Sequence, residues 1–123
     1  MIEFFTVAPE EDEAFRAAWA AAARPGATLH RALRDDVQPR FAALDPGGPD
    51  AGVLLLVEFD GDAVAWEPVF ARWTGRQGFI RARLSDGVAV IHWSSPLMYD
   101  RAVRALGDLV AALPFPHRAA LYA

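Results

Sequence analysis

Hydrophobic and polar positions change their spacing several times along the chain, and the pattern divides it into short strands and helices. Residues 2–7 (IEFFTV) predict a strand that stops before Pro9, because aromatic and β-branched residues favour extended backbone. Residues 10–23 predict a helix, since Phe15 and Trp19 share one apolar stripe with alanines. The acidic first turn of this segment suits the positive end of a helix dipole.

The following segment predicts a hairpin and then a loop. Residues 27–34 read as a strand, and residues 40–44 as the strand that returns beside it. Asp35 and Asp36 are expected to form the turn between them. Glycine, proline and aspartate occupy most positions of 45–52, which predicts a loop.

A second hydrophobic block begins with residues 53–59 (VLLLVEF). Its start is apolar at consecutive positions, which predicts a central strand with both faces covered. A helix is predicted from Ala65, with Pro68 in the first turn, where a missing backbone N–H is tolerated. The apolar stripe of this helix recurs at helical spacing and comprises Trp66, Val69, Phe70 and Trp73.

A strong hairpin signal comes next. Residues 78–84 and 88–93 each contain a strand-like pattern, and Asp86-Gly87 lies between them. This dipeptide is typical of a tight turn between two antiparallel strands. We therefore expect the two segments to pair.

The last third of the chain predicts a helix and a strand. Ser94 or Ser95 can cap a helix over 96–113, and Pro96 suits its first position. Residues 117–123 read as a short final strand. The apolar stripe expected on the helix comprises Tyr99, Val103, Leu106, Val110 and Leu113.

The order strand, helix, strand, turn, strand occurs at 2–44 and again at 53–93, which indicates a degenerate internal repeat. Residues 1–50 carry the first βαββ copy. Residues 53–123 carry the second copy, completed by a helix and a strand to βαββαβ, the ferredoxin-like order. We predict a single α+β domain over 1–123: a ferredoxin-like α/β barrel of antiparallel sheet with helices on its outer face.

Composition narrows the function. The chain has 123 residues, 54% of them hydrophobic, and a net charge of −4, which fits a folded domain and gives no basic stripe for nucleic acid. Cysteine is absent and all 12 basic residues are arginine, so thiol and lysine chemistry are excluded. The three histidines lack metal-ligand spacing. No secretory signal or membrane-spanning run is evident, and a cytoplasmic protein without membrane or nucleic-acid partners is expected.

Three stretches within residues 53–123 resemble the antibiotic biosynthesis monooxygenase (ABM) domain of the dimeric α/β-barrel superfamily. They are QGFIRARLSDG, VAVIHWSSPLMYDRAV and the ending ALPFPHRAALY. The resemblance implies an antiparallel sheet with helices on one face and a second sheet on the other, which closes a barrel within one chain or in a homodimer. Members include cofactor-independent oxygenases of polyketide-derived aromatic phenols, haem-degrading oxygenases and proteins of no known activity.

For the aromatic oxygenases, the resemblance implies a pocket between sheet and helices that Trp93 and Tyr99 line. The family's pocket asparagine corresponds to Ala89, and the iron-binding histidine of its haem-degrading members corresponds to Val103. The oxygenase interpretation therefore lacks one polar group, and the haem interpretation lacks its ligand. No cofactor and no metal is expected.

Alternation along 88–93 places Trp93 on one face of the strand and His92 on the other. Trp93 and Tyr99 are our candidates for a catalytic pair, in which the indole orients a flat substrate and the phenol donates a hydrogen bond. Both residues also suit ordinary core packing. The side chains expected to bind the substrate beside them are Ala89, Ile91, Trp66, Phe70 and Trp73.

Two hypotheses result. In the first, the protein binds a flat, apolar aromatic molecule between sheet and helices and acts as a cofactor-independent monooxygenase, with the substrate's own phenolate reducing dioxygen. In the second, it is a non-catalytic small-molecule-binding or structural α/β-barrel protein whose side chains fill the pocket. A cavity beside Trp93 would favour the first.

Overall fold

The computed structural model describes residues 5, 7–22, 25–30, 32–39 and 52–122. In chain order its elements are η1 (Pro9–Glu11), α1 (Asp12–Ala21), β1 (Ala32–Val37), β2 (Val53–Phe59), η2 (Ala63–Trp66), α2 (Glu67–Trp73), β3 (Phe79–Ser85), β4 (Val88–Trp93), α3 (Pro96–Leu106) and β5 (His117–Tyr122). Within the described ranges, no helix has the length and apolar character needed to cross a bilayer.

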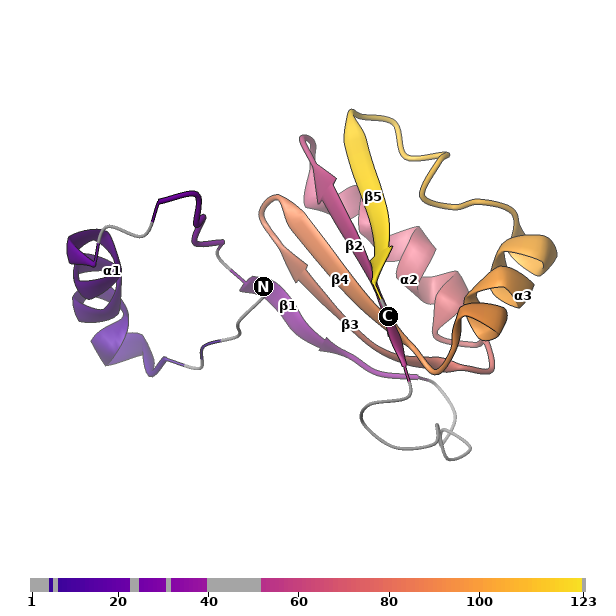
Figure 1. Ribbon diagram of the computed structural model, residues 1–123, viewed down its shortest axis with the longest axis horizontal. Coiled ribbons are helices and arrows are strands. Elements are labelled where there is room, and N and C mark those ends of the chain that lie inside the picture. Colours follow the sequence, from indigo (N-terminus) through magenta and orange to yellow (C-terminus); the bar gives the residue numbers. More distant parts are fainter. Residues whose placement is uncertain (1–4, 6, 23–24, 31, 40–51, 123) are drawn as a thin grey trace.

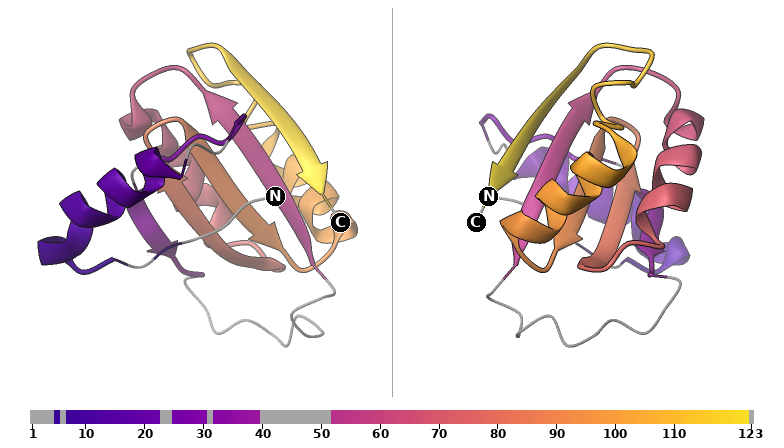
Figure 2. Two further views of the ribbon diagram at one scale, coloured as in Figure 1. Left: turned by 60° about the vertical axis from the view of Figure 1, so that its left-hand side comes forward. Right: turned by 90° about the vertical axis from the view of Figure 1, so that its right-hand side faces the viewer.

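One five-stranded sheet organises the molecule, with the order β1-β3-β4-β2-β5 and antiparallel pairing throughout. Helices α2 and α3 both lie on one face of this sheet (Figures 1 and 2). From β2 to β5 the chain runs strand, helix, strand, strand, helix, strand, and the spatial order of these four strands is the ferredoxin-like one. The structure is thus α+β.

The core lies between the sheet and helices α2 and α3. On β2 the burial alternates, and Val53, Leu55 and Val57 face the helices. They are paired in register with the helix-facing residues of β4, so that Leu55 lies opposite Ile91. The largest fully buried side chains are Trp66, Trp73, Trp93, Phe70, Phe79, Ile91 and Val57.

Local signals placed most of this unit correctly. The predicted hairpin is confirmed, with Leu84 opposite Ala89 across the turn at Asp86-Gly87. Of the two candidate caps for α3, Ser95 acts: its hydroxyl accepts a hydrogen bond from the Met98 backbone N–H at 3.2 Å.

Helix α3 is shorter than the predicted 96–113. It ends at Leu106, because Gly107 adopts a φ of 83°, a left-handed conformation that terminates helices. The chain then continues in turns. Val110 and Leu113 nevertheless reach the core, with exposed fractions of 4% and 8%.

The expected hairpin at 27–44 is wrong in its first half. Asp35 and Asp36 lie inside β1, which spans Ala32–Val37 and pairs with β3. Pairing with a sheet edge satisfies the backbone of β1 and overrides the poor strand propensity of aspartate. The predicted returning strand at 40–44 and most of the predicted strand at 2–7 and loop at 45–52 fall outside the described residues.

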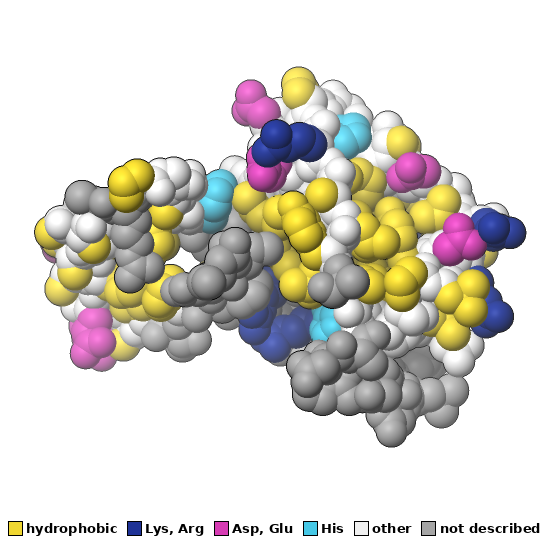
Figure 3. Space-filling model, viewed as in Figure 1, with side chains coloured by type: hydrophobic (Ala, Val, Ile, Leu, Met, Phe, Trp, Pro, Cys, Tyr) yellow, Lys and Arg dark blue, Asp and Glu magenta, His cyan; other side chains and the backbone are white. Residues whose placement is uncertain are grey.

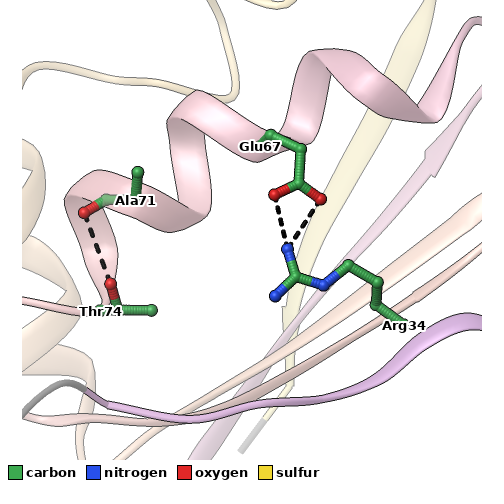
Figure 4. A network of polar contacts seen from close by, with 4 residues as sticks. All are labelled: Arg34, Glu67, Ala71 and Thr74. Carbon is green, nitrogen blue, oxygen red and sulfur yellow. Dashed lines mark hydrogen bonds and ion pairs between the residues drawn. The ribbon is translucent and has the colours of Figure 1, made fainter.

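The five strands form an open sheet, and β1 extends the same sheet as β3 rather than facing it. The barrel and the internal repeat therefore stay predictions. An ion pair ties this edge strand to the helix layer: the Arg34 guanidinium donates to both carboxylate oxygens of Glu67, at 2.7 and 2.6 Å (Figure 4). The same guanidinium lies 5.9 Å from the centre of the Phe70 ring. Thr74 closes the end of α2 by donating to the Ala71 carbonyl.

Candidate functional site

Trp93, the last residue of β4, is the centre of an aromatic cluster. Its ring meets Trp73 and Phe79 edge to face, with centroids 5.7 and 5.6 Å away, and Tyr99 at 5.5 Å. These contacts come from α2, β3 and α3, so three elements converge on one indole of β4. Its exposed fraction is 0%.

The local sequence explains why Trp93 and Tyr99 meet. Alternation on β4 turns Trp93 toward the helices and His92 toward the opposite face, as predicted. The Ser94 backbone N–H then donates to the Gly78 carbonyl at 2.8 Å, which holds the end of β4 beside the start of β3. Because α3 begins three residues after Trp93, its first turn folds back over that ring.

The η2–α2 segment supplies the second half of the cluster. Trp66 stacks on Phe70 with a centroid distance of 5.6 Å and lies 6.5 Å from Trp73. The predicted site residues thus form one buried layer in which Trp73 contacts both Trp66 and Trp93. Ala89 and Ile91 belong to the same core, both at 0% exposure.

Two polar atoms in this layer have no partner. The indole N–H groups of Trp66 and Trp93 are buried, and neither donates to another group in the described part of the chain. A buried donor without an acceptor costs about 1–3 kcal/mol, so each is an unusual feature of a core. Sequence reasoning could not find them, because hydrogen-bond satisfaction depends on the completed packing.

Tyr99 adds a third donor at the margin of the cluster. Its side chain is half-buried, and burial raises the pKa of the phenol, with the nearby carboxylate of Asp108 raising it further. The hydroxyl therefore keeps its proton at neutral pH. No charged or polar residue in the described ranges is fully buried, and the unpaired polar side-chain atoms of this layer are the two indole N–H donors.

Two histidines, His92 and His30, lie away from this layer. His92 is on the opposite face of the sheet, where burial lowers its pKa. The Nδ1 atom of His30 lies 3.3 Å from Oδ1 of Asp86, at the β3–β4 turn. The two residues are 56 positions apart, so local sequence spacing does not reveal this pair. Within the described ranges, no three His, Asp or Glu side chains are placed to hold a metal ion.

Comparisons with known proteins give no match: no family model, no curated protein and no solved structure is similar to this chain. The resemblance to the ABM domain therefore stays a hypothesis from sequence motifs. The buried aromatic layer and its two unpaired indole donors are the features that bear on function.

Proposed function

We propose that this protein binds a flat aromatic molecule that carries an acceptor oxygen, a carbonyl or a phenolate, in the layer between the sheet and helices α2 and α3. The observation that carries the proposal is the unpaired, buried N–H of Trp93, whose ring lies 5.5 Å from the ring of Tyr99, measured between centroids. A ligand acceptor would satisfy a donor that the described protein groups leave without a partner.

The surrounding rings favour a flat ligand. Trp73 and Phe79 approach Trp93 edge to face, an arrangement that a planar aromatic molecule can reproduce when it replaces one of these contacts. Since Trp93 is fully buried, binding requires a side chain to move. Tyr99 is the half-buried ring of the cluster and lies in the first turns of α3, so we assign the entrance to it.

The oxygenase reaction of the sequence hypothesis fits the same donors. In that reaction, O₂ oxidises a ring CH₂ that lies between aromatic groups to a ring carbonyl and is itself reduced, with one water released. The substrate supplies all the electrons that reduce O₂. The reacting species is the substrate's enolate or phenolate, and N–H and O–H donors stabilise that anion. Trp93 would hold the anionic oxygen, and Tyr99 would keep a proton close to it.

Ligand binding is tested with a matched pair of probes. 1,4-Naphthoquinone and naphthalene have the same two-ring frame, and the quinone alone carries acceptor oxygens. The chain has no cysteine or lysine to form quinone adducts, so reversible binding can be followed by thermal shift and tryptophan fluorescence. We expect tighter binding of the quinone, and a loss of about tenfold in that preference in Trp93→Phe, the scale of one hydrogen bond. Trp19→Phe is the control because Trp19 lies on α1.

The oxygenase step is tested separately, by oxygen uptake with anthrone- and naphthol-type phenols. Uptake that falls in Tyr99→Phe while ligand affinity stays within about threefold would support catalysis. Binding without uptake would leave a binding protein and remove the reaction.

The second candidate function is a structural domain, and one observation favours it. Trp66, Trp73 and Trp93 have exposed fractions of 0%, 1% and 0% and pack against one another, as core residues do. If neither probe stabilises the protein and no phenol supports uptake, the layer is a filled core and the first candidate is wrong.

A further inference from the structure

No described helix or strand covers the face of the sheet opposite α2 and α3, and this face is largely apolar (Figures 1 and 3). Hydrophobic side chains gather on it over β2, β4 and β5 (Figure 3). Leu54 and Leu56 of β2 are half-buried there, beside Val88 and Val90 of β4, and Tyr122 of β5 is 52% exposed. We call this surface the open face. Apolar surface of this kind marks an interaction site in many proteins.

Helix α1 also has apolar side chains that the described chain does not bury. None of its ten residues is buried, although Phe15 and Trp19 form an aromatic stripe. Phe5 covers part of that stripe, with ring centroids 5.2 Å from Phe15 and 6.0 Å from Trp19, and is itself 46% exposed. In Figures 1 and 2, α1 lies beyond the β1 edge of the sheet and covers neither of its faces.

Charge links the two surfaces. Arg81 and Arg83 of β3 lie on the open face, since they are paired in register with His92 and Val90. Both side chains have partners of their own, and their contribution is the positive charge they place beside the apolar strands. The start of α1 carries four consecutive acidic residues, which are Glu10, Glu11, Asp12 and Glu13.

The spacing of charge and aromatic groups matches as well. Strand β3 lies two strands from β2, about 10 Å across the open face. Along α1, Phe15 and Trp19 follow Glu11 by four and eight residues, roughly 6–12 Å of helix. The acidic end can therefore lie on the arginines while the aromatic stripe covers the leucines of β2.

We propose that α1 of one copy docks on the open face of a second copy, and that the second copy returns the same contact. The path of the chain favours a second copy over its own face. His30 is held at the β3–β4 turn by Asp86, and β1 then runs antiparallel along the outside of β3. The chain therefore joins the sheet at its edge, and α1 extends outward from that edge (Figure 1).

Charge reversal between two variants tests the exchange. The first variant, Glu10→Arg with Glu11→Arg, reverses the start of α1; the second, Arg81→Glu with Arg83→Glu, reverses the open face. In a dimer of either variant alone, like charges meet in both contacts between α1 and the open face. We therefore expect the dimer dissociation constant of each variant to rise at least about tenfold. When the two are mixed, both contacts regain opposite charges, and the heterodimer should return to near wild-type affinity by sedimentation velocity.

A matched control, Arg72→Glu with Arg101→Glu, makes the same charge change on exposed positions of α2 and α3 and should leave the dimer intact. Circular dichroism of each variant checks that it is folded. Leu56→Asp, which disrupts the open face without reversing its arginines, should also abolish the dimer.

Three results would overturn the proposal. Wild-type protein that stays monomeric throughout the micromolar range has no exchange. A dimer that the open-face variant loses and the α1 variant keeps has sheets in direct contact, without α1. If the mixture does not regain the dimer, and a single chain with all four substitutions is a monomer that regains wild-type stability, α1 covers its own open face.

Discussion

Trp73 and Trp93, the final residues of α2 and β4, meet edge to face with ring centroids 5.7 Å apart and planes at 85°. This contact joins the helix layer to the sheet at the point where both rings are buried. The candidate ligand site and the hydrophobic core are therefore the same side chains. Substitutions at Trp93 must be assessed for folding and for binding separately.

The first prediction concerns the stability that Trp93 provides. Trp93→Ala should lower the free energy of unfolding by about 3–5 kcal/mol, because it removes a fully buried ring and leaves a cavity. Trp93→Phe should cost clearly less, since it keeps one ring and removes the unpaired N–H. Urea unfolding followed by circular dichroism measures both. Equal losses for the two variants would contradict this prediction.

The second prediction concerns Gly78, which precedes β3. Its φ is 91°, and an added Cβ would clash with the Cβ of Met98 on α3. Gly78→Ala should therefore combine backbone strain of about 1–3 kcal/mol with a clash between β3 and α3. Gly107→Ala is the matched control, because its φ is 83° but no atom lies within 4 Å of the added Cβ. If Gly107→Ala destabilises the protein as much as Gly78→Ala, the contact with α3 is unimportant.

The third prediction uses the raised pKa of Tyr99. The folded chain holds this proton above the ordinary tyrosine pKa of 10.0, at which the unfolded chain releases it. The protein should lose stability from this group as the pH rises above about 10. Tyr99→Phe removes that part of the pH dependence. An unchanged slope in the variant, measured by urea unfolding between about pH 9 and 11, would contradict burial of the phenol.

The fourth prediction uses the lowered pKa of His92 on the open face. Burial disfavours the charged form in the folded state, so the unfolded chain binds the proton first as the pH falls below the ordinary value of 6.5. Stability from this group should therefore decrease below that pH. His92→Gln should flatten the acid side of the unfolding profile. A steeper acid loss in the variant would reverse the assigned direction.

The sequence predicted the features that local signals determine. Asp86-Gly87 specified the β3–β4 hairpin, Ser95 and Pro96 the start of α3, and alternation the orientation of Trp93. Gly107 could have predicted the end of α3, but the apolar residues at helical spacing beyond it favoured a longer helix.

Contacts between distant segments could not be predicted in this way. Strand β1 runs through Asp35-Asp36 because it pairs with β3, some 50 residues later in the chain, and His30 meets Asp86 for the same reason. The unpaired indole donors also appear after packing, because they depend on which acceptors the fold leaves within reach.

If the buried indole N–H groups donate to an acceptor on a ligand, the indole resonances of ¹⁵N-labelled protein should report that binding directly. The chain has four tryptophans, and single Trp→Phe variants assign their signals. With 1,4-naphthoquinone, the Trp93 N–H proton should shift downfield, and that of Trp66 with it if the ligand spans the layer, while Trp19 on α1 stays in place. Naphthalene should produce no such downfield shift. If all four indole signals are unchanged, or if both probes shift Trp93 equally, the donors are not a binding site and the layer is only the core of the fold.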